Sequence, residues 1–129
     1  MKNIFTILIF CFSFLSVGSI AAQTHFDNLK NRNYTAIANK MAPKVNVQIN
    51  RKKKLVSKEK AIQMLRTRLE EFNPIEWKLL HRGESEAENG RYMIAALTNE
   101  AGEGIRLFIQ VEKSTNGPQI SSVRIRKAL

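Results

Sequence analysis

The sequence predicts an α+β domain in which N-terminal helices pack on one face of a curled antiparallel sheet. An early region has apolar residues at helical spacing, and a later region alternates apolar and polar residues with a period of two. Turn-forming residues separate four strand-like segments in that later region, namely 75–82, 91–98, 105–113 and 120–127. Consecutive strands with short turns form an antiparallel meander, and helices cover its apolar face.

Two short helices are expected before the first strand. Residues 25–30 form the first, and the second begins after Asn33, whose side chain suits an N-cap, and runs from Tyr34 to about Met41. Pro43 ends it, since proline cannot continue a helix.

The next segment predicts a strand followed by a basic turn. Val45, Val47 and Ile49 alternate with polar residues, as expected for a half-buried strand. The run from Arg51 to Lys54 follows, and four like charges between a strand and a helix are typical of a solvated turn.

The longest helix is predicted from Ser57 to Phe72. Ser57 is a favoured N-cap, Glu59 complements the helix dipole, and Asn73-Pro74 ends the helix. One apolar stripe is expected to face the core: Ala61, Ile62, Leu65, Leu69 and Phe72.

The third late strand shows the alternation best. Its apolar side chains, Ile105, Leu107, Ile109 and Val111, are expected to face the helices. Its other side is polar, so the opposite face of the sheet is expected to meet solvent or a partner.

Residues 1–22 are typical of a cleavable export signal. Lys2 precedes an apolar segment, Ile4 to Val17, and small residues near Ala21 and Ala22 suit signal peptidase. Two alternatives stay open: a retained membrane anchor, or lipidation of Cys11, which Phe10 before it disfavours. Cleavage predicts a periplasmic or secreted protein without a stable membrane anchor and without a thiol, since Cys11 is the one cysteine.

Residues 23–129 then form a single basic domain. Losing Lys2 leaves 20 cationic residues against 11 acidic ones, a net charge of +9. In an exported protein such a charge favours anionic lipids, polysaccharides or acidic proteins over nucleic acid. It is also compatible with a role in solubility alone.

The order of elements and several motifs resemble a family of small exported bacterial proteins called domain of unknown function 4783. The residues that carry the resemblance are 55–61 with Phe72-Asn73-Pro74, 80–85, Tyr92 with Ile94, and 120–125. That family is similar to the nuclear-transport-factor-2-like, or cystatin-like, superfamily, which implies a cone with a pocket between sheet and helices. The resemblance implies no catalytic residues, because the family has no assigned activity.

Four residues are candidates for lining such a pocket: His81, Trp77, Tyr92 and Tyr34. His81 is expected to share a strand face with Ile75, Trp77 and Leu79, where it would serve as an acid or base. A structural role is the favoured interpretation for each of the four, His81 as a residue that caps a turn or hydrogen-bonds in the core, and the rings as core. No carboxylate falls on a face that should be buried, so a general base is hard to place.

A metal site is not expected. His25, near the predicted mature N-terminus, is expected to be mobile, and two isolated histidines without cysteine do not make a ligand set. No glycine-rich phosphate loop or nucleophile motif is present, so no cofactor is expected.

Phe108 stands on the polar side of its strand, between Arg106 and Gln110. An exposed ring there hints at a contact surface, with Arg124 and Arg126 from the next strand, and the superfamily resemblance implies a possible homodimer through this face. A solvated arginine face is the alternative.

The sequence therefore predicts an exported, non-catalytic domain that binds a small ligand, an envelope component or a protein. Two alternatives remain: a charge-driven interaction protein at an anionic envelope surface, or a pocket enzyme of the isomerase, dehydratase or cyclase type with His81 and a tyrosine as its acid–base pair.

Overall fold

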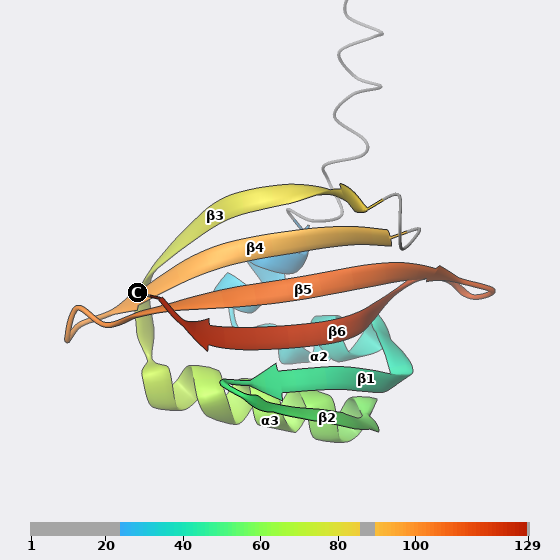
Figure 1. The fold of residues 1–129 in the computed structure, drawn as a ribbon, viewed down its shortest axis with the longest axis horizontal. Coiled ribbons are helices and arrows are strands. Elements are labelled where there is room, and N and C mark those ends of the chain that lie inside the picture. Colours follow the sequence, from blue (N-terminus) through green and yellow to red (C-terminus); the bar gives the residue numbers. More distant parts are fainter. Residues whose placement is uncertain (1–23, 86–89, 129) are drawn as a thin grey trace, which may run out of the picture.

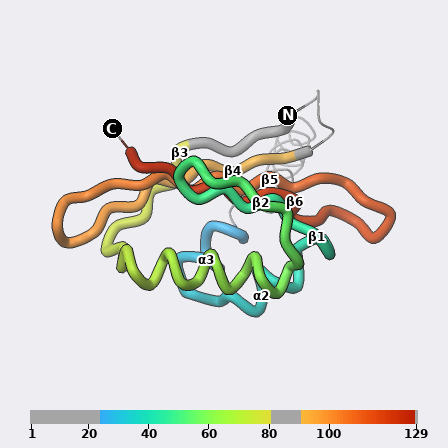
Figure 2. The backbone as a smooth tube through the Cα atoms, turned by 60° about the horizontal axis from the view of Figure 1, so that its bottom comes forward, coloured from blue at the N-terminus to red at the C-terminus, as the bar shows by residue number. Residues whose placement is uncertain are grey.

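The computed structural model describes the backbone of residues 24–85 and 90–128, and the side chains of residues 24–80 and 91–128. The expected signal peptide with Cys11 lies outside these residues, as does the His81 side chain. The protein has two layers, a curved six-stranded sheet and a set of helices on one of its faces (Figures 1 and 2). No helix in this part of the chain is long and apolar enough to span a bilayer.

The helical layer begins with residues 24–30 and continues with α2, Tyr34–Asn39. The predicted N-cap is confirmed, because the Asn33 side chain accepts a hydrogen bond from the Ala36 N–H over 3.3 Å. The predicted end is wrong by two residues: α2 stops at Asn39, and Met41 already pairs with Ile120 in the sheet. The buried backbone around Met41 thus obtains its hydrogen bonds from a strand instead of a helix turn.

The long helix α3, Lys58–Phe72, has both predicted ends. The Ser57 hydroxyl accepts from the Lys60 N–H over 3.3 Å. Asn73 adopts a left-handed conformation, with φ of 51°, and its N–H donates to the Leu69 carbonyl oxygen over 2.8 Å. Four members of the predicted stripe are buried, and Ile62 packs against them in part.

The strands are β1 Met41–Ile49, β2 Lys52–Ser57, β3 Pro74–Ser85, β4 Gly90–Asn99, β5 Gly104–Ser114 and β6 Gly117–Lys127. They lie in the order β2-β1-β6-β5-β4-β3. The predicted antiparallel meander β3-β4-β5-β6 is confirmed. The sheet as a whole is mixed, because β1 runs parallel to β6.

Strand β2 was not predicted. Lys52, Lys53 and Lys54 pair with Ile49, Gln48 and Val47 of β1 in an antiparallel hairpin, so the predicted solvated turn is confined to Asn50 and Arg51. A charged strand is stable here because β2 is an edge strand, with one side open to water, and lysines at such an edge discourage pairing with another chain.

The core lies between the inner face of the sheet and the helices. The alternation predicted for β5 is confirmed: Ile105, Leu107 and Ile109 are buried and Val111 packs against them in part. Strand β3 departs from prediction, because irregularities interrupt its pairing with β4 before Glu76 and before His81. Ile75 is consequently 66% exposed, and the backbone of His81 pairs with that of Ile94. Trp77 and Leu79 keep the predicted inward position, opposite Leu97 and Ala95.

Candidate functional site

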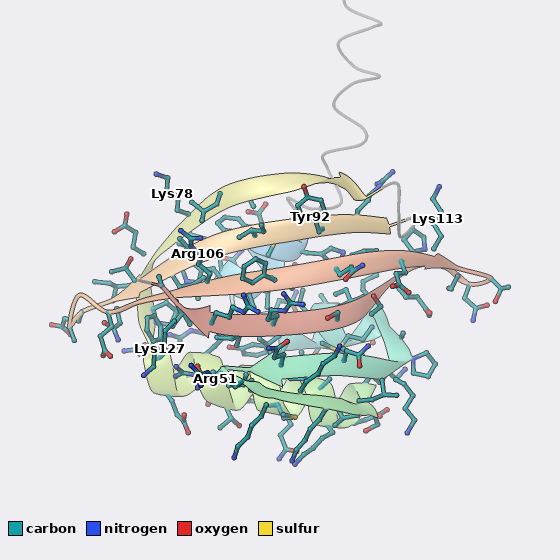
Figure 3. The ribbon with its side chains drawn as sticks, in the orientation of Figure 1. Arg51, Lys78, Tyr92, Arg106, Lys113 and Lys127 are labelled. Carbon is teal, nitrogen blue, oxygen red and sulfur yellow. The ribbon has the colours of Figure 1, made fainter. Side chains whose placement is uncertain are left out.

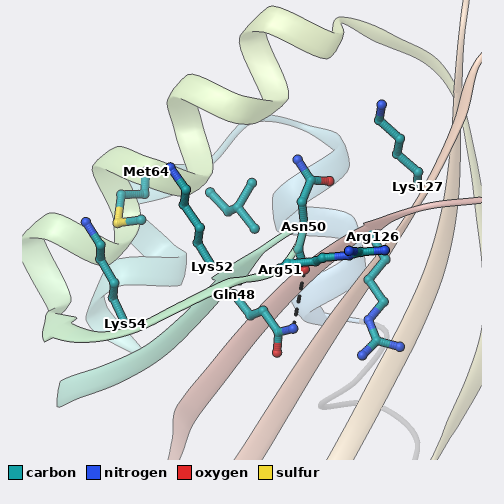
Figure 4. A pocket seen from close by; sticks show the side chains of 9 residues that line it. Gln48, Asn50, Arg51, Lys52, Lys54, Met64, Arg126 and Lys127 are labelled. Atoms are coloured by element: carbon teal, nitrogen blue, oxygen red, sulfur yellow. Dashed lines mark hydrogen bonds between the residues drawn. The ribbon is translucent and has the colours of Figure 1, made fainter.

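A hollow of about 950 Å³ opens where the β1–β2 turn, the end of β6 and α3 come together (Figure 4). Strands β1 and β6 supply neighbouring walls, because they are paired in the sheet. We call this site the basic hollow. Its lining residues are Gln48, Ile49, Asn50, Arg51, Lys52, Lys54, Met64, Arg126 and Lys127.

The turn at Asn50 joins the two strand ends that form the hollow. Asn50 has a φ of 59°, a left-handed conformation that asparagine tolerates better than most residues. Its N–H donates to the Ile125 carbonyl oxygen over 2.9 Å, and its own carbonyl oxygen accepts from the Gln48 Nε2 over 3.3 Å. These bonds hold Arg51 close to the end of β6, which carries Arg126.

Pairing in the β1–β2 hairpin orients the lysines of β2. Lys52 lies opposite Ile49, and Lys54 lies opposite Val47. Because paired residues share a face, both lysines extend to the side of the sheet that α3 covers, where Met64 forms part of the wall (Figure 4). Lys53 lies opposite Gln48 and belongs to the outer face.

The basic hollow is strongly cationic. Five of its nine lining residues carry a positive charge, and none is acidic. No ion pair connects any of these five cations to a carboxylate of a described residue; the ion pair Arg66–Glu70, at 3.1 Å, lies on the exposed surface of α3. Several like charges around one concave site raise the local potential and attract anions. A smaller hollow of about 360 Å³ adjoins it and shares Ile49 and Met64.

Of the four predicted pocket residues, the three whose side chains are described, Trp77, Tyr92 and Tyr34, do not line the basic hollow. Trp77 is half-buried on the inner face, with its ring edge-on to Phe26 at 6.1 Å between centroids. Tyr34 lies on α2 under the Arg66 guanidinium, 5.8 Å from the ring centroid. Burial and the negative charge of Glu70 raise the pKa of the Tyr34 phenol above its ordinary value.

The other two candidates lie elsewhere. Tyr92 follows the outer-face register, opposite Gln110 (Figure 3). The backbone of His81 pairs with Ile94, and its side chain is outside the described part. The structure therefore does not bring the four predicted residues together.

The four residues predicted as an interface do lie together on the outer face. Arg126 is opposite Arg106, and Arg124 is opposite Phe108 in the β5–β6 pairing. The Arg124 guanidinium lies over the Phe108 ring at 5.8 Å, a cation–π contact. Arg126 also borders the basic hollow, so the hollow and this face are continuous.

Sequence reasoning missed the remaining cations of the hollow. No ligand-binding motif includes these cations, which are Arg51, Lys52, Lys54 and Lys127. The run from Arg51 to Lys54 was predicted to be a turn. One signal was available: Lys52 and Lys54 precede Val56 at a spacing of two, which places all three on one strand face if the run is extended.

His25 differs from its prediction as well. It belongs to the first helix and is 9% exposed instead of mobile, and its Nδ1 has no hydrogen-bond partner among the described residues. Burial, together with the positive charge of Lys40, lowers the pKa of the His25 imidazole. The described residues include no group of three potential metal ligands, from His25 or elsewhere.

Solved structures share this arrangement of helices and curved sheet. A protein of unknown function with a cystatin-like fold from Methylobium petroleophilum has a TM-score of 0.62 and 11% identity, over 88% of this chain and 77% of that one. An NTF-2 like protein of unknown function from Silicibacter pomeroyi has a TM-score of 0.57 and 15% identity, over 90% and 98%. The fold is therefore that of the nuclear-transport-factor-2-like, or cystatin-like, class of α+β domains.

Within that class, the chain belongs to the family described as "Domain of unknown function (DUF4783)", whose model matches residues 23–126. A member of this family from Bacteroides ovatus has a TM-score of 0.66 and 21% identity, over 74% of this chain and 84% of that one. No curated protein matches the chain.

Proposed function

We propose that this protein is a non-catalytic binding domain and that its ligand is an anion held in the basic hollow. One observation carries the proposal: five cationic side chains converge on a concave site, and none of the described residues that line it is acidic. Such a site favours anionic groups and disfavours cations and neutral apolar ligands.

The chemistry of the lining supports binding rather than catalysis. General acid–base catalysis works best with a group whose pKa lies near the working pH, usually histidine or a carboxylate. The described residues that line the hollow include neither. The predicted acid–base pair of His81 and a tyrosine gains no support, since Tyr34 and Tyr92 lie apart from the hollow.

We propose further that the domain acts after export. The support is the sequence of residues 1–22, with its short basic start, apolar segment and small residues before the expected cleavage site. Fractionation of cells followed by N-terminal sequencing tests this step: a mature chain that starts near Gln23 outside the cytoplasm supports it, and an intact cytoplasmic chain contradicts it.

Binding of compact anions tests the hollow directly. Calorimetric titration of the domain with pyrophosphate at low ionic strength should give saturable binding that weakens with added salt. Lys54→Glu, inside the hollow, should weaken it about tenfold. Lys113→Glu makes the same charge change at the far end of β5, away from Arg51 and Lys127 (Figure 3). This variant should change the affinity for pyrophosphate much less. Equal effects of the two variants, or no binding of pyrophosphate, would overturn the proposal.

A charge-driven role at an anionic envelope surface is the alternative, because cationic residues continue beyond the hollow. Sedimentation with vesicles that contain phosphatidylglycerol separates the two. Vesicle binding that responds equally to Lys54→Glu and Lys113→Glu favours the alternative, since such binding would depend on total charge and not on the hollow.

A further inference from the structure

A row of cations continues from the basic hollow across the outer face of the sheet. Arg126 of β6, at the border of the hollow, is opposite Arg106 of β5. Arg106 is opposite Ala96 of β4, and Ala96 is opposite Lys78 of β3. In Figure 3, Arg51, Lys127, Arg106 and Lys78 follow one another across the sheet from the β1–β2 turn to β3. We call Arg126, Arg106 and Lys78 the cationic row.

The charges of the cationic row lower the stability of the sheet, and a purely structural role does not explain why they are there. Like charges directly opposite each other on paired strands destabilise a sheet, and Arg106 faces Arg126 in this way. All three side chains of the row are exposed, and none forms an ion pair with a described carboxylate. The small side chain of Ala96 leaves the path between Arg106 and Lys78 uncovered. An anion lying along the row would relieve the repulsion.

The length of the row selects an extended ligand. Three strand spacings separate β6 from β3, which is about 14 Å at the usual distance between neighbouring strands. A compact anion seated in the hollow cannot reach Lys78. A linear chain with repeated anionic groups can occupy the hollow and the row together, and gains affinity from each added contact.

Side chains beside the row indicate what kind of chain it is. The adjacent register positions on β1, β6 and β5 are Gln48, Arg124 and Phe108. An amide and a guanidinium donate hydrogen bonds to sugar hydroxyls. The Phe108 ring lies under the Arg124 guanidinium, 5.8 Å from the ring centroid, and supports that donor group on the outer face. The exposed large apolar residues, Leu55, Ile75 and Leu80, lie instead on the edge strands β2 and β3.

That distribution disfavours a folded protein or a second copy of the chain on this face. The core of a protein–protein interface is apolar and depleted of charge, whereas three arginines, Arg106, Arg124 and Arg126, lie on the neighbouring strands β5 and β6 of this face. In a symmetric dimer with its twofold axis across the centre of the row, Arg126 of one copy would oppose Lys78 of the other, a pair of like charges.

We propose that the ligand of the basic hollow is a linear anionic polysaccharide, and that its chain leaves the hollow over Arg126 and crosses the outer face along Arg106 to Lys78. The proposal rests on the proposed function, because it extends the anion site of the hollow.

The test measures affinity against chain length. Oligogalacturonates from the dimer upward carry one carboxylate on each sugar and serve as probes, and their methyl-esterified forms serve as uncharged controls. Affinity should rise steeply with length until the chain spans hollow and row, and should then level off. The esterified chains should bind far more weakly at every length.

Two double variants locate the path. Arg106→Gln with Lys78→Gln should weaken the binding of long oligomers about tenfold or more. It should also make the slope of log affinity against log salt concentration shallower by about two, one for each cation removed. Pyrophosphate binding should stay unchanged. Lys30→Gln with Lys113→Gln removes the same charge elsewhere and should leave both affinities close to those of the parent. Thermal unfolding of each variant verifies that the fold is intact.

The outcomes separate this inference from the function it extends. Pyrophosphate binding without a gain for longer oligomers, or a gain that the row variant does not reduce, overturns the polysaccharide path and leaves the hollow in place. Loss of all anion binding in the parent protein overturns both. Poly-glutamate of equal charge that binds as tightly as the oligogalacturonate, with the same dependence on Arg106 and Lys78, assigns the row to an acidic peptide and overturns the polysaccharide.

Discussion

The backbone N–H of Asn50 donates to the Ile125 carbonyl oxygen over 2.9 Å, so the turn of the edge hairpin is attached to the end of β6. This bond extends the β1–β6 pairing into the turn and connects the two segments that carry the cations of the basic hollow. The left-handed φ of Asn50 makes the bond possible.

Replacing Asn50 with valine should disturb this attachment. A β-branched side chain is strained at a positive φ, so the free energy of unfolding should fall by about 1–2 kcal/mol. Pyrophosphate affinity should fall with it, because Arg51 would no longer be held beside Arg126. Urea denaturation and calorimetry measure the two effects.

Asn50→Gly is the matched control, since glycine adopts a positive φ without strain. It should retain most of the stability and affinity. A valine variant as stable as the glycine variant would show that the turn conformation does not matter.

The buried His25 predicts acid sensitivity. Its folded-state pKa is lowered from 6.5, by burial first and by Lys40 second, so the unfolded chain takes up the proton first as pH falls. The free energy of unfolding should therefore decline as pH drops below 6.5 toward the lowered folded pKa, with no contribution from this group above 6.5.

Urea denaturation of the parent protein and of His25→Phe, from about pH 8 to pH 5, measures this contribution. The phenylalanine variant should lose the part of the pH dependence that His25 causes. Identical pH profiles for both proteins would contradict the prediction. Lys40→Gln should reduce the slope in part, because it removes only the second cause.

The apolar stripe of α3 predicts a large effect of truncation. Leu65 is fully buried between α3 and the sheet, and Leu65→Ala should lower the free energy of unfolding by about 2–5 kcal/mol through lost contacts and the cavity left behind. Gln63→Ala, on the exposed side of the same helix, should change it by less than about 0.5 kcal/mol. Comparable losses in chemical denaturation would mean that α3 does not pack as described.

The N-cap of α3 predicts a smaller effect. Ser57→Ala removes the oxygen that accepts from the Lys60 N–H and should cost about 1 kcal/mol of stability. Ser57→Asp retains an acceptor and should stay near the parent in thermal unfolding. A drop as large as that of the alanine variant would speak against capping by this side chain.

Local patterns predicted the elements that depend on local physics. The alternation of Ile105, Leu107 and Ile109 predicted β5, and the caps and the apolar stripe predicted α3. Burial of side chains repeats every two residues in a strand and about every 3.6 residues in a helix, so the sequence shows the pattern directly. The fold class was predictable for the same reason.

Features that depend on distant partners were not predictable. Strand β2 lacks an apolar alternation and exists because β1 offers it an edge. The irregularity in β3 before Glu76 changes which face Ile75 takes, and no residue type in the sequence indicates it. The basic hollow needs Arg51 and Arg126 to meet, although 75 positions separate them in the chain.

The parallel pairing of β1 with β6 has a consequence for the order of folding. Residues 46–49 find their partners at residues 122–125, so closing the sheet brings together segments that are far apart in sequence, a late and slow event in folding. The β1–β2 hairpin cannot reach its final place before β6 is present. The cations of the hollow therefore converge only in a chain that has finished folding, so a ligand that recognises them would distinguish the completed domain from its intermediates.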